Sequence, residues 1–320
     1  MELIKAIFSI TLMTSAIRLA TPIILIAIGA ALCNKAGVLN LALDGMTTTC
    51  AFVAIVATYL FRNFTTIGIN NPMLATYFGV LAAMLFGALI GALLAFVHTK
   101  YNIDLVLLSI ALNMLAVDIT VYLMRAIFNK SGTWSDPSIK QLNSISLPLI
   151  NKIPIIGDLL SNYNIIVYLS WIITIVLVIL VNKTKFGLHV NAVGENPKAA
   201  KAVGINVKKV QYIALITSGL LAGLAGSFLS IGHLTLFTRD MAAGRGWLGN
   251  AAALFGFNAP GGSFFAGLFF GFAEALALRL QNVTTIPPFL IQILPYLLTL
   301  AILAIVSYKA MREKKKKFLF

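Results

Sequence analysis

The chain has 320 residues, of which 59% are hydrophobic and only 11% are charged, and its formal net charge is +14. A soluble domain carries roughly 25% charged residues, so this composition excludes a protein whose whole surface faces water. Apolar runs of about 20 residues, each long enough to cross a bilayer, recur along the sequence, and the alternating pattern of a membrane β-barrel is absent. The sequence therefore predicts an all-α, polytopic membrane protein.

Positive charge gathers in two places. Residues 183–209 and residues 309–317 each hold six of the 24 Lys and Arg residues. Both clusters flank apolar spans, which is typical of cytoplasmic segments under the positive-inside rule. We therefore interpret the charge as a sign of membrane topology rather than of nucleic-acid binding. Cys33 and Cys50 are too few for a disulfide framework.

The first half of the chain contains six predicted crossings. Arg18 and Pro22 divide the first apolar stretch into two short pieces, which we expect to cross as a pair. Three longer spans follow, and then a polar loop at residues 129–162 that we place outside. The predicted crossings of this half are residues 3–17, 23–33, 41–61, 73–97, 104–127 and 163–181.

The first basic cluster carries helix signals of its own. Asn196 is a good N-cap, Pro197 suits the first helical position, and Gly204 can end a helix in the left-handed conformation. These signals predict a helix of about two turns, with an apolar surface that includes Ala199 and Ala200. Such a helix on the cytoplasmic side indicates a docking site for a partner. The alternative is an ordered loop between two spans.

Four crossings are predicted after this segment. Three are long apolar spans, but three alone would place the basic tail (residues 309–320) outside, against the positive-inside rule. The short, Gly-rich stretch 247–257 is the candidate for the fourth, and we expect a broken helix sheltered by protein. The crossings are residues 212–231, 247–257, 262–280 and 289–308. With about ten spans, both termini are expected in the cytoplasm, and residues 1–320 form a single transmembrane domain.

The order of these spans suggests an inverted repeat. The four segments from residue 23 to 127 and the four from residue 212 to 308 would run in opposite senses across the membrane. Each set opens with a span and then a Gly-containing polar stretch. Residue identity between the two sets is negligible, so chance similarity is the alternative. Inverted repeats place a substrate site near the bilayer midplane, between discontinuous helices.

Polar and ionisable side chains inside a bilayer are costly, so they usually face a cavity or a partner. Structural roles are the alternatives. Asn40 and Asp44 could stabilise a helix N-terminus, and Asn113 could form an interhelical hydrogen bond. Asp118 points to a different face than Asn113, and we expect it to pair with Arg125. The candidates for substrate binding are Asn40, Asp44, Asn113, Arg245, Trp247 and Glu274.

A resemblance to a known family rests on four segments. They are G-V-L-N-L-A-L-D-G-M at 37–46, A-V-G-E-N-P-K-A-A-K-A-V-G-I-N-V at 192–207, S-G-L-L-A-G-L-A-G at 218–226 and G-R-G-W-L-G-N-A-A-A-L-F-G at 244–256. Together they resemble the permease subunits of ABC importers of the branched-chain amino acid, ribose and nucleoside class. Within that class the chain is most similar to the shorter nucleoside permease. It departs from the usual pattern at Asp44, Trp247 and Asp118, where Glu, Phe and a small residue are more common.

The resemblance implies that the helix at Asn196 is a coupling helix, seated in a groove of a separate ATPase subunit. Further implied partners are a second, paralogous permease and an extracellular lipoprotein that binds the substrate. The chain has no G-x-x-x-x-G-K-[ST] phosphate loop, so ATP and Mg²⁺ would bind the ATPase, and we expect no cofactor, catalytic residue or metal ligand here. The expected coupling residues are Gly194, Glu195, Asn196, Pro197, Ala199, Ala200 and Gly204.

The predicted function is transport of nucleosides, and of purine nucleosides in particular, across a bacterial inner membrane. Nucleosides are flat, neutral and rich in hydroxyl groups, so amide and carboxylate partners with a few apolar walls suit them. A branched-chain amino acid or ribose permease of the same class is the alternative. A passive channel is a further alternative, and it would need no docking helix.

Overall fold

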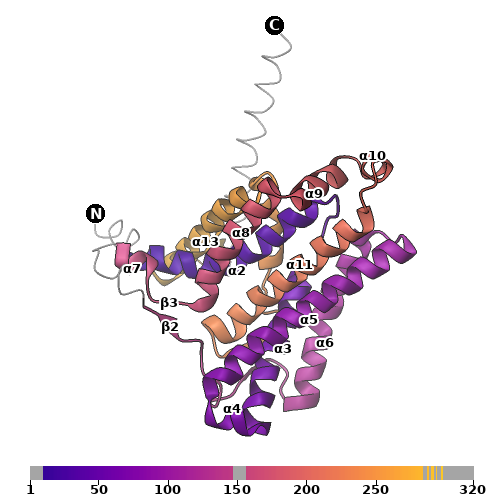
Figure 1. The fold of residues 1–320 in the computed structure, drawn as a ribbon. Helices are drawn as coiled ribbons and strands as arrows, with labels where there is room; N and C mark the ends of the chain where they lie inside the picture. Colours follow the sequence, from indigo (N-terminus) through magenta and orange to yellow (C-terminus); the bar gives the residue numbers. More distant parts are fainter. Residues whose placement is uncertain are drawn as a thin grey trace.

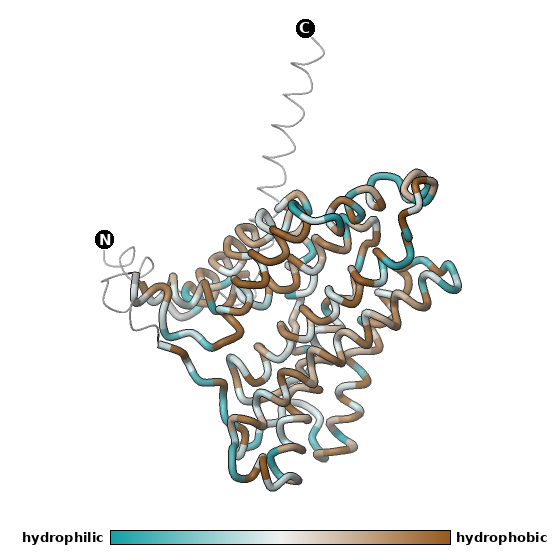
Figure 2. The backbone as a smooth tube through the Cα atoms, in the orientation of Figure 1, coloured by the Kyte–Doolittle hydropathy of each residue, from teal (hydrophilic) through white to brown (hydrophobic). Residues whose placement is uncertain are grey.

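The computed structural model describes residues 10–146 and 156–283, together with residues 287, 290, 291, 293 and 297. Within these residues, seven helices are long and apolar enough to cross a membrane. Figure 2 shows apolar residues along the helices and polar residues gathered at their connections. The spanning helices are α2 (Ile10–Lys35), α3 (Leu43–Phe64), α5 (Pro72–Tyr101), α6 (Leu105–Phe128), α8 (Ile165–Lys183), α11 (Val207–Ser227), which continues as the π-helix η1 (Phe228–His233), and α13 (Pro260–Val283).

These helices confirm a polytopic, all-α membrane fold. The predicted spans at 41–61, 73–97, 104–127, 163–181, 212–231 and 262–280 each correspond to one helix. Almost all of the predicted crossing at 289–308, and the whole tail at 309–320, lie outside the described residues.

The first two predicted crossings are wrong, because they are replaced by one continuous helix, α2. Pro22 lies inside this helix, where a proline removes one backbone hydrogen bond and usually kinks or breaks the chain. Neighbouring helices cover α2, and 83% of the residues in its most apolar 18-residue stretch are buried. The Arg18 guanidinium lies 5.7 Å from the centre of the Tyr163 ring, so its charge sits over an aromatic face. Tertiary packing therefore maintains a helix that local signals divide.

The two ends of the helix bundle carry different connections. At one end, Lys35 of α2 donates a 3.2 Å hydrogen bond to Asn191 of α9 (Lys185–Glu195), and α10 (Pro197–Ala202) follows α9. At the other end lies α4 (Thr66–Asn70), and Figure 1 shows α4 and α10 far apart. Because the last turn of α2 contacts α9, α2 begins at the end opposite to the basic segment. This differs from the predicted first crossing, which starts on the same side as the basic segment.

Short strands tie the connections together at the end that holds α4. β1 (Thr133–Ser135) pairs antiparallel with β4 (Leu236–Thr238), so the polar loop after α6 contacts the segment that follows η1. β2 (Ser144–Ile145) pairs antiparallel with β3 (Tyr163–Asn164), just before α8. A five-residue helix, α7 (Ile156–Leu160), lies between β2 and β3. This loop is thus partly structured rather than an open connection.

The segment between β4 and α13 passes through the bundle with a short helix. α12 (Arg245–Phe255) has 11 residues, and at 1.5 Å per residue it spans about half of a bilayer's hydrocarbon core. Beyond it, Asn258 Oδ1 accepts a 2.9 Å hydrogen bond from Asn34 Nδ2, close to α9. Residues 239–258 therefore run from the β1–β4 end of the bundle to the α9 end, as expected for the predicted broken crossing at 247–257.

Small residues allow the central helices to approach each other closely. A Cβ atom added to Gly87 of α5 would lie 2.1 Å from the carbonyl oxygen of Gly219 of α11, and one added to Gly91 would lie 2.3 Å from that of Leu215. Helices in membranes associate through such contacts because lipid provides little hydrophobic drive between them. This packing fixes α5 and α11 beside α3 and so positions the start of α3.

Candidate functional site

Two helices begin inside the bundle rather than at its ends. The irregular residues 36–42 precede α3, and an irregular stretch, residues 239–244, precedes α12. Gly37 and Gly244 have φ angles of +73° and +83°, which side-chain-bearing residues rarely adopt. The first N–H groups of a helix have no intrahelical partner and carry partial positive charge. Each interruption therefore presents hydrogen-bond donors to its surroundings.

The starts of α3 and α12 contact each other directly. The Gly246 N–H donates a 2.8 Å hydrogen bond to Asp44 Oδ1, which places the carboxylate of one helix start on the amide of the other. A Cβ atom at Gly246 would lie only 2.3 Å from the Asp44 Cα atom, so no larger residue fits without a shift of one helix. The sequence left open a role for Asp44 at a helix N-terminus. Asp44 has this role, but it accepts the hydrogen bond from the start of α12 rather than from its own helix.

Asn113 of α6 bridges the interruption before α3. Its Oδ1 atom accepts a 2.8 Å hydrogen bond from the Gly45 N–H, and its Nδ2 atom donates a 2.9 Å bond to the Leu41 carbonyl. One side chain therefore satisfies a backbone donor and a backbone acceptor on either side of the helix start. This is the interhelical hydrogen bonding that the sequence left as an alternative to a substrate contact.

Asn40 is fully buried, and its side chain forms a hydrogen bond within its own loop. Its Oδ1 atom accepts a 3.0 Å hydrogen bond from the Ala42 N–H, and its Nδ2 atom donates to Ser218 of α11 over 3.2 Å. The residue at the N-cap position of α3 is Ala42, so Asn40 is not the cap of this helix. Asn40 instead anchors the interrupted segment to α11.

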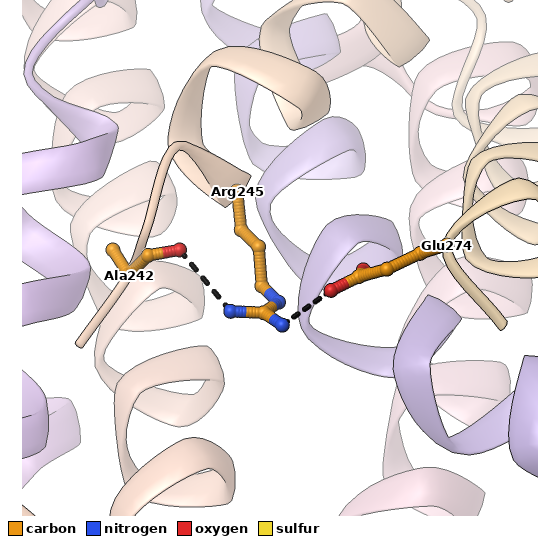
Figure 3. A network of polar contacts seen from close by, with 3 residues as sticks. All are labelled: Ala242, Arg245 and Glu274. Carbon is orange, nitrogen blue, oxygen red and sulfur yellow. Dashed lines mark hydrogen bonds and ion pairs between the residues drawn. The ribbon is translucent and has the colours of Figure 1, made fainter. Parts of the chain in front are cut away.

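Arg245 and Glu274 form an ion pair beside the start of α12 (Figure 3). Arg245 Nη2 contacts Glu274 Oε1 of α13, and Arg245 Nη1 donates a 3.4 Å hydrogen bond to the Ala242 carbonyl. Only 18% and 17% of the two side chains are exposed. Glu274 has no basic residue within four positions along its own helix, and its partner comes from α12. The pair holds α12 against α13 and concentrates polar groups inside the bundle.

Several buried polar atoms of α12 and α13 have no hydrogen-bond partner. Within the described residues, Arg245 Nε, Glu274 Oε2 and Asn250 Oδ1 are buried and have no hydrogen-bond partner. Buried polar atoms in proteins are usually paired. This part of the bundle therefore holds one donor and two acceptors that the described residues leave unpaired.

The structure brings five of the six candidate residues into one contiguous polar region at the starts of α3 and α12. Trp247 is the exception, because 46% of it is exposed and, in the part of the chain that the structure describes, no hydrogen bond ties its side chain to the others. Gly246, Asn250 and Ser218 belong to the region and were not predicted. The close approach of Gly246 to Asp44 depends on the fold, although the alternation of Gly and Arg in residues 244–246 is a signal that could have indicated it. Among the described residues, no group of three or more His, Cys, Asp or Glu gathers that could hold a metal ion.

The segment predicted to couple to a partner forms α10 as the signals indicate. Asn196 Oδ1 accepts 3.1 Å hydrogen bonds from the N–H groups of Lys198 and Ala199. Gly204 has a φ of +85° beyond the helix end. Ala200, however, is only 3% exposed and packs inward. The expectation that Ala200 forms part of a docking surface is therefore revised.

A groove lies beside α10 on the same end of the bundle. Its volume is about 680 Å³, and it lies between α10, the start of α11 and the turn after α5. Its walls include His98, Thr99, Lys198, Lys201, Val207 and Gln211. The exposed residues of α10 border this groove, so the end of the bundle offers both a projecting helix and a basic recess.

α9 connects α10 to the interruption before α3. A Cβ atom at Gly194 would lie 2.1 Å from the Lys35 carbonyl oxygen, and Gly37 is the next neighbour at 3.4 Å. Gly194 is thus required for backbone contact between the end of α9 and the end of α2. Because the backbone of Gly194 contacts that of Gly37, a displacement of α9 would shift Gly37 and, along the same irregular segment, Asn40.

A second pocket, of about 460 Å³, opens at the β2–β3 end of the bundle. It is lined by polar side chains that include Arg18, Gln141, Asn143, Tyr163, Asn164 and His233. Burial raises the pKa of Tyr163 to about 12, although the nearby Arg18 charge acts in the opposite direction. The phenol is therefore a neutral hydrogen-bonding group at physiological pH.

Comparisons with known proteins agree on a family. The family described as "Branched-chain amino acid transport system / permease component" matches residues 12–303. The guanosine ABC transporter permease protein NupQ of Bacillus subtilis (strain 168) is 32% identical over 288 residues, which cover 88% of this chain and 87% of NupQ. The nucleoside ABC transporter permease protein NupC of Lactococcus lactis subsp. cremoris (strain MG1363) is 30% identical over 303 residues, 92% of each chain. A second guanosine permease protein of the same Bacillus, NupP, is 24% identical over 306 residues, 94% of this chain and 83% of NupP.

Proposed function

Since this chain belongs to the branched-chain amino acid transport system / permease component family, we propose that it carries nucleosides, and purine nucleosides in particular, through the membrane as one permease of an ABC importer. It is a multi-pass protein of the cell membrane and a transport component without an ATPase domain of its own. The observation that carries the choice of nucleosides is the similarity to NupQ and NupC, which extends over about nine-tenths of the chain at 32% and 30% identity.

The chemistry of the site supports this choice. Asp44, Asn113, Glu274 and Arg245 supply carboxylate, amide and guanidinium groups, and unpaired acceptors and a donor remain beside them. A nucleoside offers ribose hydroxyls and base edges, and it carries no net charge that would need a buried counter-ion. A zwitterionic amino acid would need a separate partner for each charged end, and the one ion pair of the site already neutralises itself.

We propose an inverted repeat as the basis of the site. In each half, a long helix (α2 or α11) leads into an irregular stretch with a positive-φ glycine, and then into a helix that starts inside the bundle (α3 or α12). The two starts meet at Asp44 and Gly246. Discontinuous helices of this kind commonly bind substrate near the midplane of transporters with inverted repeats.

We propose that the end with α9 and α10 is cytoplasmic and docks a separate ATPase, which binds ATP and Mg²⁺. The charge of the basic segment supports this orientation. The end with β1 and β4 then faces the outside, where a lipoprotein would deliver the substrate. NupP and NupQ, two guanosine permease proteins of one bacterium, support a second, paralogous permease as partner. Residues 1–320 would act as one transmembrane domain.

Uptake by cells tests the proposed substrate. A purine auxotroph that lacks its own nucleoside importers would express this chain with its ATPase, second permease and binding protein. We expect uptake of radiolabelled guanosine that excess adenosine inhibits and that ribose or leucine does not. Inhibition by leucine or ribose instead of nucleosides would assign the chain to a different substrate of the same family.

A further inference from the structure

Of the seven described spanning helices, α6 has the least cover from other residues of the chain. In the most apolar 18-residue stretch of α6, only 22% of the residues are buried, whereas 78% are buried in the corresponding stretch of α11 with η1. One side of α6 holds Asn113 against the start of α3. The opposite side forms a continuous exposed face at helical spacing, which we call the α6 outer face: Leu107, Ile110, Met114, Asp118, Tyr122 and Arg125.

Asp118 lies in the middle of the α6 outer face. At 1.5 Å per residue, it is about 20 Å from the start of the helix and about 15 Å from its end. It therefore reaches the depth at which an ionised carboxylate is least tolerated by lipid. The exposed faces of α5 and α8 show the contrast, because neither helix contains an acidic residue.

The other acids of the described spans each have a partner within the chain. Asp44 accepts a hydrogen bond from the Gly246 N–H, and Glu274 pairs with Arg245. Asp118 has neither a hydrogen bond nor an ion pair with any described residue. The sequence expectation of a pair with Arg125 is wrong, because Arg125 is two turns, about 10 Å, further along the same face. A partner for Asp118 would therefore come from outside this part of the chain.

We propose that the α6 outer face is the contact surface for the second permease chain, and that Asp118 pairs there with a basic side chain of that chain. The proposal rests on the proposed function, in which two permeases form the transport path. Asn113 ties α6 to the interrupted start of α3, so the contact would lie on the far side of a helix that contributes to the candidate site. An assembled pair would thereby shield the carboxylate from lipid.

A second copy of this chain fits the α6 outer face less well than a paralogue. A twofold axis along the membrane normal keeps equivalent residues at equal depth, so an α6–α6 contact would set Asp118 opposite Asp118. Arg125 of the copy would be about 10 Å away in depth. Arg245, a mostly buried cation of the described bundle, is already paired with Glu274. A paralogue can instead carry the basic residue at the required depth.

Photocrosslinking in the assembled importer tests the location of the contact. A photoreactive phenylalanine analogue would replace Met114 or Tyr122, which are 70% and 69% exposed, with Ile175 and Ile179 of α8 as controls at 60% and 52%. We expect crosslinks from positions 114 and 122 to a membrane helix of the second permease, identified by mass spectrometry, and none from the α8 positions. Lipid adducts alone, or crosslinks to a second copy of this chain, would overturn the proposal.

Substitution of Asp118 tests the pairing. Asp118→Leu should lower the amount of second permease that copurifies by tenfold or more, Asp118→Asn should lower it less, and Asp118→Glu should leave it nearly unchanged. The amount of this chain in the membrane should not fall with Asp118→Leu, because an exposed acid is replaced by an apolar residue. Full copurification with Asp118→Leu would contradict the pairing. These readouts measure assembly, so they hold even if the transported substrate is not a nucleoside.

Discussion

Arg245 and Glu274 bring opposite charges into the interior from positions 29 residues apart. A buried ion pair adds little net stability, but removal of one partner is costly because it leaves the other charge uncompensated. The pair is therefore better explained by what it positions than by the stability that it adds. It fixes the first residue of α12, next to the Gly246–Asp44 contact, and leaves one donor and one acceptor of its own unpaired.

Substitutions of Glu274 should separate positioning from binding. Glu274→Leu should destabilise the protein by about 2 kcal/mol, less than the 3–5 kcal/mol of a fully buried pair because both side chains keep some exposure. Glu274→Gln should be milder, since an amide still accepts a hydrogen bond from Arg245. In the Glu274→Leu, Arg245→Leu double variant we expect stability to recover but guanosine uptake to stay at least tenfold reduced. Recovery of uptake together with stability would give the pair a purely structural role.

Gly246 offers a direct test of the contact between the two helix starts. Gly246→Ala places a methyl group where the Asp44 Cα atom lies 2.3 Å away, so we expect a loss of about 1–3 kcal/mol, as for other overpacked sites, and reduced uptake. Gly261→Ala is the matched control, because its nearest neighbour would be at an ordinary 3.5 Å. Thermal unfolding of the detergent-solubilised protein measures both. Equal midpoints for the two variants would show that α12 is not pressed against α3.

At this scale, the sequence identifies residue types but not their partners. Asp44, Asn113 and Glu274 could be predicted because polar groups in apolar spans are costly. The bonds that they make could not, since each crosses from one helix to another: Gly246 to Asp44 spans 202 residues, and Arg245 to Glu274 spans 29. Asp118 was assigned the wrong partner because helical spacing to Arg125 gives the same face but not the same depth.

α9 and α10 together link the surface to the candidate site. α10 could be predicted from a cap, a proline and a glycine. The sequence did not predict α9, because its short, Gly-containing sequence resembles a loop. α2 was divided at Pro22, although packing against other helices keeps it continuous. Local signals are thus reliable for exposed elements such as α10 and less so where tertiary contacts decide the conformation.

Bulky substitutions on α10 should distinguish its docking side from its packed side. Ala199 is exposed, so Ala199→Trp should block the ATPase and lower uptake at least tenfold while thermal stability stays unchanged. Ala200 is buried, so Ala200→Trp should also lower stability. Lys198→Ala should be mild, because an exposed ion pair contributes about 0–1 kcal/mol. Wild-type uptake by Ala199→Trp, with the ATPase still bound, would remove α10 from the coupling path.

The whole molecule is polarised along its helices. The basic segment with its groove lies at one end, the short strands and the second pocket lie at the other, and two interrupted helices meet between them. Contacts from α9 through Gly194 to the loop before α3 connect the first end to the centre. This arrangement permits docking at one end to change the geometry of the central site.

Reporter fusions test the orientation of the molecule. Fusions at Lys201 and Lys314 should both report the cytoplasm, and one at Ser144 should report the outside. The positive-inside rule and the course of residues 239–258 across the bundle support this expectation. Opposite signals at Lys201 and Lys314 would mean that residues 239–258 do not complete a crossing.

The most direct test of nucleoside transport is ATP hydrolysis by the complete complex in proteoliposomes. The complex would contain this chain, the second permease and the ATPase, with the binding protein added at a fixed concentration. We expect binding protein loaded with guanosine to stimulate ATP hydrolysis and to drive labelled guanosine into the vesicle interior that the binding protein cannot reach. Stimulation by ribose or leucine but not by guanosine, or guanosine entry without ATP, would contradict an ATP-driven nucleoside importer.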